Sequence, residues 1–152
     1  MPTIPEMVTK IRELYATQLP PADAAELARA AEVFRSEFGI EMPDDYRELL
    51  EQCNGIGFNG VLFYSTQDGE TRKGAARFGL GEANERLIRG QHEIDTTLRF
   101  VGETGNQLFA YDTADRRWKE VDRTSWDLDS PDDAYDTFTA LFTAQYDTFV
   151  DW

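Results

Sequence analysis

The sequence predicts an α+β domain in which N-terminal helices precede a meandering antiparallel sheet, with helices covering one face of the sheet and an aromatic helix at the C-terminus. Three observations support this fold class. Apolar residues recur at helical spacing in the N-terminal third, short apolar runs separated by polar turns follow between residues 61 and 121, and helical spacing returns near the end. The 152 residues contain no repeat and no long linker, so a single domain over residues 1–152 is expected.

Three helices are predicted in the N-terminal third of the chain. The first, over residues 3–15, begins with a potential capping box. The second carries an apolar stripe through residues 27–38 and ends at Gly39, a residue suited to a left-handed cap. The third begins near Pro43, has two aspartates in its first turn, where the helix dipole favours anions, and ends at the Asn-Gly pair of residues 54–55.

Short strands are predicted in the middle of the chain. Residues 61–64 form an apolar run that is typical of a buried strand, and residues 98–101 form a second one. A hairpin is predicted to join residues 108–111 to residues 118–121 through an aspartate-rich turn. A short helix over residues 82–89 is expected between the first two strands.

The last helix is predicted to begin at Ser130. Ser130 can cap it, Pro131 suits its first helical position, and Asp132 and Asp133 would lie in its first turn. Apolar residues, mostly aromatic, follow at intervals of 3.6 residues as far as Phe149. This segment supplies the aromatic C-terminal helix of the predicted fold.

The chain is strongly acidic, and its acidity is concentrated near the C-terminus. Its formal net charge is -14 at pH 7, and seven aspartates follow Arg123, the last basic residue. Such a surface repels nucleic acid and anionic lipid and favours cationic partners through long-range steering. We therefore expect neither a nucleic-acid nor a membrane partner. Acidity that serves only solubility, for instance in a saline cell, is the alternative interpretation.

A cytoplasmic location is predicted. The N-terminus lacks the basic region and apolar core of a secretion signal, and no apolar run approaches the length of a membrane span. Cys53 is the only cysteine, so it cannot form a disulfide within the chain. Because it lies in an apolar helical pattern, it is interpreted as a buried, reduced thiol.

The sequence contains no recognisable catalytic, metal or cofactor site, so the chain is not expected to be an enzyme. A G-x-G-x-x-G pattern over residues 55–60 leaves a helix and enters a strand, which is the reverse of the order in dinucleotide-binding folds. Residues 127–132 alternate carboxylates as a calcium loop does, but Phe138 stands where such a loop needs glutamate. His92 is the only histidine, which excludes a histidine-based zinc site, and its pairing with the inward-facing Cys53 is disfavoured.

Acidic and aromatic side chains near the C-terminus are the candidate partner-binding residues. Aromatic residues at helical spacing are expected to face the sheet, which leaves three others as candidates for exposed anchors. The predicted set consists of Trp126, Asp127, Asp129, Asp132, Asp133, Tyr135 and Trp152. The aspartates would steer a basic partner, and the aromatic residues would supply a desolvated centre.

Two segments resemble the SUKH superfamily, which includes fungal cell-wall assembly regulators and many bacterial immunity proteins. Residues 38–55, FGIEMPDDYRELLEQCNG, are similar to its signature of an apolar pair, a proline, an acidic-aromatic-basic helix start and a closing Asn-Gly. Residues 100–112, FVGETGNQLFAYD, look like its glycine-containing strand pair. The resemblance covers about residues 30–150, and the short runs are similar in particular to the YrhA-like branch.

The resemblance implies two functions that do not involve catalysis. The first is an immunity protein that neutralises a bacterial polymorphic or contact-dependent toxin by occlusion, with a basic surface on the toxin as the complement of the acidic residues. The alternative is a regulatory scaffold that recruits other proteins, as the fungal members imply. Each signature position also has a folding role, so the signature identifies a scaffold rather than a site. The oligomeric state stays open.

Overall fold

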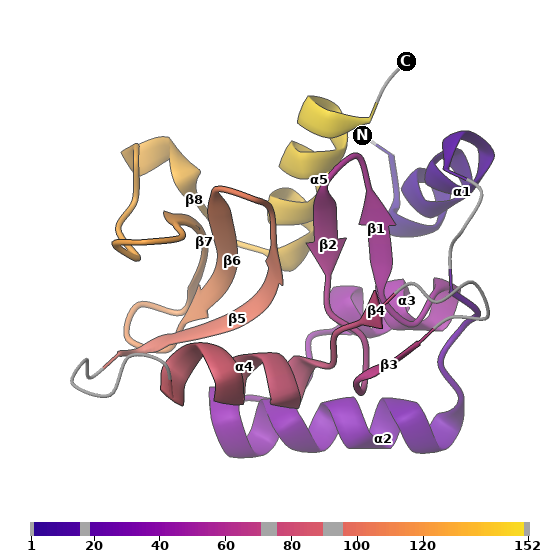
Figure 1. Cartoon of the computed structure of the whole chain (residues 1–152), viewed down its shortest axis with the longest axis horizontal. Helices are drawn as coiled ribbons and strands as arrows, with labels where there is room; N and C mark the ends of the chain where they lie inside the picture. The colour runs from indigo at the N-terminus through magenta and orange to yellow at the C-terminus, as the bar shows by residue number, and fades with distance from the viewer. Residues whose placement is uncertain (1, 16–18, 71–75, 90–95, 151–152) are drawn as a thin grey trace.

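The computed structural model describes residues 2–15, 19–70, 76–89 and 96–150, and in them it confirms an α+β architecture (Figure 1). The α-helices of these residues are α1 (Ile4–Leu14), α2 (Ala24–Val33), α3 (Asp44–Gln52), α4 (Leu80–Arg89) and α5 (Phe138–Phe149). A π-helical turn, η1 (Phe34–Phe38), continues α2, and a 3-10 turn, η2 (Pro131–Asp133), precedes the last strand. None of the helices that the structure describes combines the length and the apolar character needed to cross a lipid bilayer.

The strands of the described residues form one large antiparallel sheet and one small one. The large sheet has the order β1-β2-β5-β6-β7-β8, and β3 pairs with β4 in the small sheet. The bounds are β1 (Ile56–Phe58), β2 (Val61–Phe63), β3 (Gly69–Glu70), β4 (Ala76–Arg77), β5 (Leu98–Glu103), β6 (Gln107–Asp112), β7 (Arg117–Asp122) and β8 (Ala134–Tyr135). Consecutive strands of the large sheet are mostly neighbours, as the prediction of a meander requires.

The predicted helix signals act as expected in the N-terminal third. The Thr3 hydroxyl accepts a hydrogen bond from the Glu6 amide at 3.3 Å and caps α1. Gly39 ends η1 at φ +70°, a left-handed conformation that glycine adopts without a steric penalty. Cys53 follows α3 and is fully buried, which confirms the interpretation of a buried thiol. Burial raises the pKa of this thiol to about 12.

The glycine-rich segment 55–60 is a short strand followed by a tight turn. β1 pairs with β2 through Asn59 and Gly60, which both have positive φ angles, 47° and 85°. Two positive angles at the centre of a two-residue hairpin loop match the twist of the flanking strands. The segment therefore leaves α3 and enters a strand, as predicted. β1 itself was not predicted.

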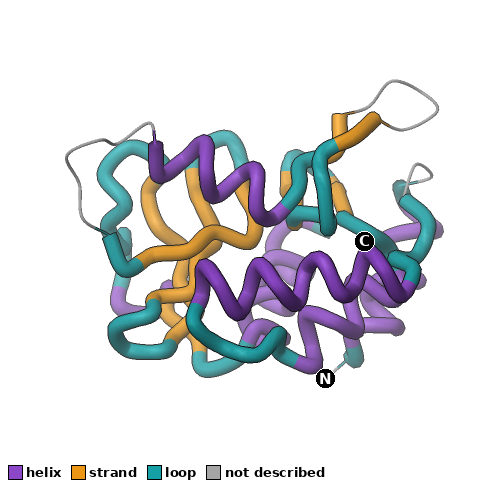
Figure 2. Tube along the Cα trace, turned by 90° about the horizontal axis from the view of Figure 1, so that it is seen from below, coloured by secondary structure: helices purple, strands orange, loops and turns teal. Residues whose placement is uncertain are grey.

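One face of the sheet packs against helices. On this face Phe63 stacks on Phe109 with ring centroids 5.1 Å apart. Phe138 of α5 contacts Phe63 at 5.6 Å and Trp118 of β7 at 5.4 Å. Figure 1 shows α5 against the sheet, and α2 and α4 lie in front of the strands in the view of Figure 2. The predicted coverage of one face by helices is confirmed.

The side chain of Asn84 completes the hydrogen bonding of β5. β2 pairs with β5 only at Gly102 and Glu103, so the edge of β5 before these residues has no strand beside it. There the Asn84 carboxamide oxygen accepts from the Phe100 amide at 2.6 Å, and its nitrogen donates to the Phe100 carbonyl at 2.7 Å. Since Asn84 is buried in α4, a helix protects this edge through one polar side chain.

The predicted start of the last helix is wrong. The Ser130 hydroxyl does accept from the Asp132 amide at 3.2 Å, but it caps only the single turn η2. The chain then extends as β8, in which Tyr135 pairs with Trp118 of β7. α5 starts after a second cap, Thr137, whose hydroxyl accepts from the amide of residue 140 at 3.1 Å. Pairing with the sheet edge prevents the helix from forming at the first cap.

Candidate functional site

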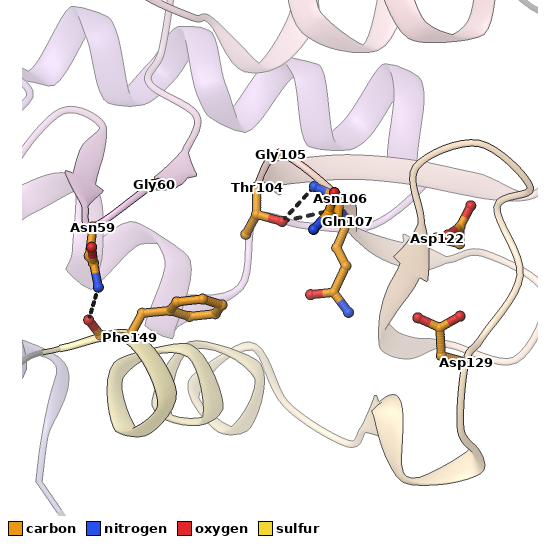
Figure 3. A pocket seen from close by; sticks show the side chains of 9 residues that line it. All are labelled: Asn59, Gly60, Thr104, Gly105, Asn106, Gln107, Asp122, Asp129 and Phe149. Carbon is orange, nitrogen blue, oxygen red and sulfur yellow. Dashed lines mark hydrogen bonds between the residues drawn. The ribbon is translucent and has the colours of Figure 1, made fainter.

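A polar pocket of about 490 Å³ lies at the end of the sheet beside the C-terminal end of α5. Its walls are the β1–β2 turn at residues 59–60, the β5–β6 turn at residues 104–107, and the side chains of Asp122, Asp129 and Phe149. Figure 3 shows the two carboxylates on one wall, Phe149 on the opposite wall and the amides of the β5–β6 turn between them. The pocket therefore joins four segments that are distant in sequence.

Hydrogen bonds fix two of the pocket walls. The Asn59 amide nitrogen donates to the Phe149 carbonyl at 2.8 Å, which ties the β1–β2 turn to the end of α5. The Thr104 hydroxyl accepts from the amides of Asn106 and Gln107 at 3.3 and 3.0 Å, which closes the β5–β6 turn. These walls present amides and hydroxyls, which suit a polar or charged occupant.

Asp122 ends β7 and organises the turn that follows. Its carboxylate accepts from the amides of Thr124 and Ser125 at 2.8 and 2.9 Å, and its carbonyl accepts from the Trp126 amide at 2.9 Å. Its own amide donates to the carbonyl of Asp127 at 2.8 Å. The amide donors hold the pKa of Asp122 below its usual range, so this carboxylate is ionised at neutral pH.

The predicted aspartates lie together on one exposed segment. We call residues 127–133 the acidic loop. In it Asp127, Asp129 and Asp132 are exposed and Asp133 is half-buried. Asp129 also lines the polar pocket, where it joins Asp122. Reasoning from the sequence missed Asp122, although an aspartate that ends a predicted strand was a signal for a side chain at the sheet edge.

Two of the three predicted aromatic anchors, Trp126 and Tyr135, are half-buried rather than exposed. Trp126 is half-buried, and its ring packs against Phe100 at a centroid distance of 5.0 Å. Tyr135 is half-buried in β8, where its hydroxyl donates to the Glu120 carboxyl at 3.2 Å. Both contacts anchor the β7–β8 connection to the sheet, which explains why neither side chain is fully exposed. Trp152 lies outside the described residues.

Leu128 is the exposed apolar side chain of the acidic loop. It is 37 % exposed and lies between Asp127 and Asp129. Among the described residues, the only other large hydrophobic side chain that is exposed is Leu14 of α1. The sequence offered a signal for Leu128, since a leucine between two aspartates outside any apolar pattern has no expected core position.

Acidic side chains, Cys53 and His92 are groups of this chain that could bind a metal ion or act as nucleophiles. Across the residues that the structure describes, no three His, Cys, Asp or Glu side chains are grouped so that they could hold a metal ion. Cys53 is enclosed in the core, and His92 lies outside the described residues.

Comparison with known proteins identifies the family. No curated protein matches the chain. The family model of SMI1 / KNR4 (SUKH-1) matches residues 21–144, from the segment before α2 to the middle of α5. This match covers most of the chain and includes both segments that resemble the SUKH superfamily, while assignment to the YrhA-like branch stays a prediction. The chain therefore belongs to the SMI1 / KNR4 family, SUKH-1.

Proposed function

We propose that this protein is an immunity protein of the bacterial cytoplasm that binds a polymorphic or contact-dependent toxin and neutralises it by occlusion. Membership of the SMI1 / KNR4 family is compatible with an immunity protein and supports a role in binding rather than in catalysis. The observation that carries the proposal is the acidic loop, an exposed segment in which aspartates flank an exposed leucine. Its partner would be a protein with a basic surface.

The basic residue that is nearest to the acidic loop in sequence is paired elsewhere. Arg123 is the last basic residue of the sequence. Its guanidinium pairs with the Glu103 carboxylate at 2.6 Å and donates to the Thr104 carbonyl at 2.9 Å. Arg123 is therefore held at the β5–β6 turn. A basic surface that approaches Asp127, Asp129 and Asp132 would meet a negative potential, which accelerates association.

Leu128 gives the acidic loop an apolar centre. Interfaces combine a desolvated apolar core with a polar rim. Leu128, with a carboxylate on each side, has this arrangement on a small scale. The polar pocket beside Asp129 would receive a polar or cationic side chain of the partner. In this proposal the aspartates set the association rate, and Leu128 slows dissociation.

The proposal is tested by association kinetics with the toxin encoded beside the gene of this chain. A variant in which Asp127, Asp129, Asp132 and Asp133 are all replaced by asparagine should associate at least about tenfold more slowly at low salt. Its association rate should also depend less on salt than that of the wild type, because screening acts on the charges that were removed. Leu128→Ala should instead raise the dissociation rate.

A matched control removes the same charge elsewhere. Glu32, Glu41, Asp44 and Glu51 are exposed on and near α2 and α3, and their replacement by the corresponding amides leaves the acidic loop intact. This control should associate at nearly the wild-type rate. Equal association rates for the wild type and the loop variant would refute steering by the loop. Equal slowing in both variants would show that net charge acts without a specific surface.

The same family match supports a regulatory scaffold that recruits other proteins as the alternative function. Co-purification with the products of neighbouring genes separates the two. Capture of an adjacent multidomain toxin supports immunity, whereas capture of envelope or metabolic proteins together with indifference to the toxin supports the scaffold.

A further inference from the structure

A buried carboxyl group lies on the helix-covered face of β7 and has no role in the proposed binding surface. Glu120 is 9 % exposed and lies opposite Phe109 of β6 in the sheet. Gln145 of α5 donates a hydrogen bond to one oxygen of the Glu120 carboxyl. The Tyr135 hydroxyl of β8 donates to the other oxygen at 3.2 Å. Both of these hydrogen bonds to Glu120 therefore come from uncharged side chains.

The third neighbour of Glu120 is a second carboxyl group. Asp133 of η2 lies within hydrogen-bonding reach of Glu120, and Asp132 lies near Tyr135 in the same turn. Among the described residues, no lysine or arginine forms an ion pair with Glu120. Lys119, its neighbour in sequence, lies on the opposite face and pairs with Asp112 at 2.8 Å. Within the described part of the chain, no cation therefore compensates a negative charge on Glu120.

We propose that Glu120 and Asp133 form a proton-dependent latch that holds η2 and β8 against the sheet edge when Glu120 is protonated and releases them when it is ionised. Two carboxyl groups at hydrogen-bonding distance attract each other only when they share a proton. Protonated Glu120 donates its O–H to the Asp133 carboxylate, while its carbonyl oxygen accepts from Gln145. After ionisation, two negative charges face each other, and the charge on Glu120 is buried.

Apart from the packing of Tyr135 against the core, few contacts hold the segment that the latch controls. β8 pairs with β7 at two positions only, and these pairs involve residues 134 and 135. Arg117 adds an ion pair to Asp136 at 3.2 Å and a hydrogen bond to the carbonyl of Ala134 at 3.3 Å. The Asp136 side chain is 87 % exposed, so this ion pair is weak. A change at Glu120 can therefore decide whether η2 and β8 stay docked.

The transition falls in the neutral range. Desolvation by burial raises the pKa of Glu120 to about 7; the hydrogen bond from Tyr135 opposes this rise, and Asp133 adds to it. The latch belongs to the isolated chain, and it operates whether or not the protein binds a toxin. The released segment includes Asp132, Asp133 and Tyr135 of the predicted binding set, so any partner that engages them would meet a docked or an undocked segment according to pH.

Hydrogen exchange of the amides of residues 132–136 tests the latch in the unbound protein. In the wild type, their protection factors should fall roughly tenfold between about pH 5.5 and about pH 8.5, the change that one unit of pKa difference produces. Glu120→Gln keeps a neutral donor toward Asp133 and should show constant protection. Asp133→Asn removes the opposing charge and should make the decline shallower, while the burial of Glu120 keeps part of it. Asp132→Asn, in the same turn, should behave as the wild type does.

A carbon-13 titration of the Glu120 carboxyl measures the proton directly. The latch predicts that Glu120 titrates in the same pH range in which the protection of residues 132–136 is lost. Titration at the ordinary value of a glutamate, or pH-independent protection in the wild type, would overturn the proposal. A decline of the protection factors with pH that is as steep in Glu120→Gln as in the wild type would overturn it equally. If Glu120→Gln does not fold, Asp133→Asn provides the same test.

Discussion

Replacing Trp126 by alanine and by glycine separates the side chain of this residue from the backbone that carries it. Trp126 has a φ of +60°, in the left-handed region. A side chain in this region costs roughly 1–2 kcal/mol, and glycine does not incur this cost. Both variants lose the same contact between the indole ring and Phe100. They differ in whether the strain of the turn remains and in the larger conformational entropy that glycine loses on folding.

The expected order of stability is the reverse of the usual one. Truncation of a fully buried tryptophan costs about 3–5 kcal/mol, so loss of a half-buried ring should cost about 2 kcal/mol. Trp126→Ala should show this full loss. Trp126→Gly should recover about 1 kcal/mol of it, because glycine relieves the strain. At positions with negative φ, alanine is instead the more stable of the two residues.

Urea unfolding followed by far-ultraviolet circular dichroism measures the difference without relying on the fluorescence of the residue removed. Ser125 in the same turn is the control with ordinary φ, and there alanine should be more stable than glycine. Arg116, with φ +61° in the β6–β7 turn, is the control with left-handed φ and an exposed side chain, and there glycine should be more stable. If Trp126→Ala equals or exceeds Trp126→Gly in stability, the strain argument is refuted.

Three further predictions concern single side chains. Asp45→Ala should destabilise the fold by about 1–3 kcal/mol, because the Asp45 carboxylate accepts two hydrogen bonds from Thr139 at 2.8 and 2.9 Å. Asp44→Ala, at an exposed site, should change thermal stability little. Equal effects of the two substitutions would contradict this role of Asp45. The pKa of Glu120 rises from 4.5 to about 7 on folding, so the free energy of unfolding should be highest below pH 4.5 and fall by up to about 3 kcal/mol as the pH rises through 7. Urea unfolding over this pH range should show no such decline in Glu120→Gln. Cys53, buried and with a pKa of about 12, should react with thiol reagents only after unfolding, and rapid labelling of the native protein would show the reasoning to be wrong.

The sequence was sufficient where local signals were decisive. Thr3 marks a helix start through its hydroxyl, and Gly39 marks a helix end because it has no side chain. The hairpin of β6 and β7 follows from alternating apolar runs around a turn. The start of α5 was not predictable, because Ser130 and Thr137 both have the chemistry of a cap. Only the pairing of β8 with β7, a contact between distant parts of the chain, decides between them.

The candidate site was predictable in composition but not in form. The exposed aspartates of the acidic loop could be anticipated, because charged residues beyond a strand rarely become buried. The burial of Trp126 depends on its left-handed backbone and on the position of Phe100 in another strand. The polar pocket depends on four segments that meet at the end of the sheet, and no pattern within one segment indicates such a meeting.

The bond between Asn84 and β5 has a consequence for the behaviour of the protein at high concentration. The strand edge that Asn84 occupies belongs to one of the most apolar runs of the chain, which includes Leu98, Phe100 and Val101. A free edge of this kind would recruit a strand from another molecule and begin a growing cross-molecular sheet. A single carboxamide, held in place by α4, occupies that docking position in advance and so keeps this edge of β5 from serving as a template for aggregation.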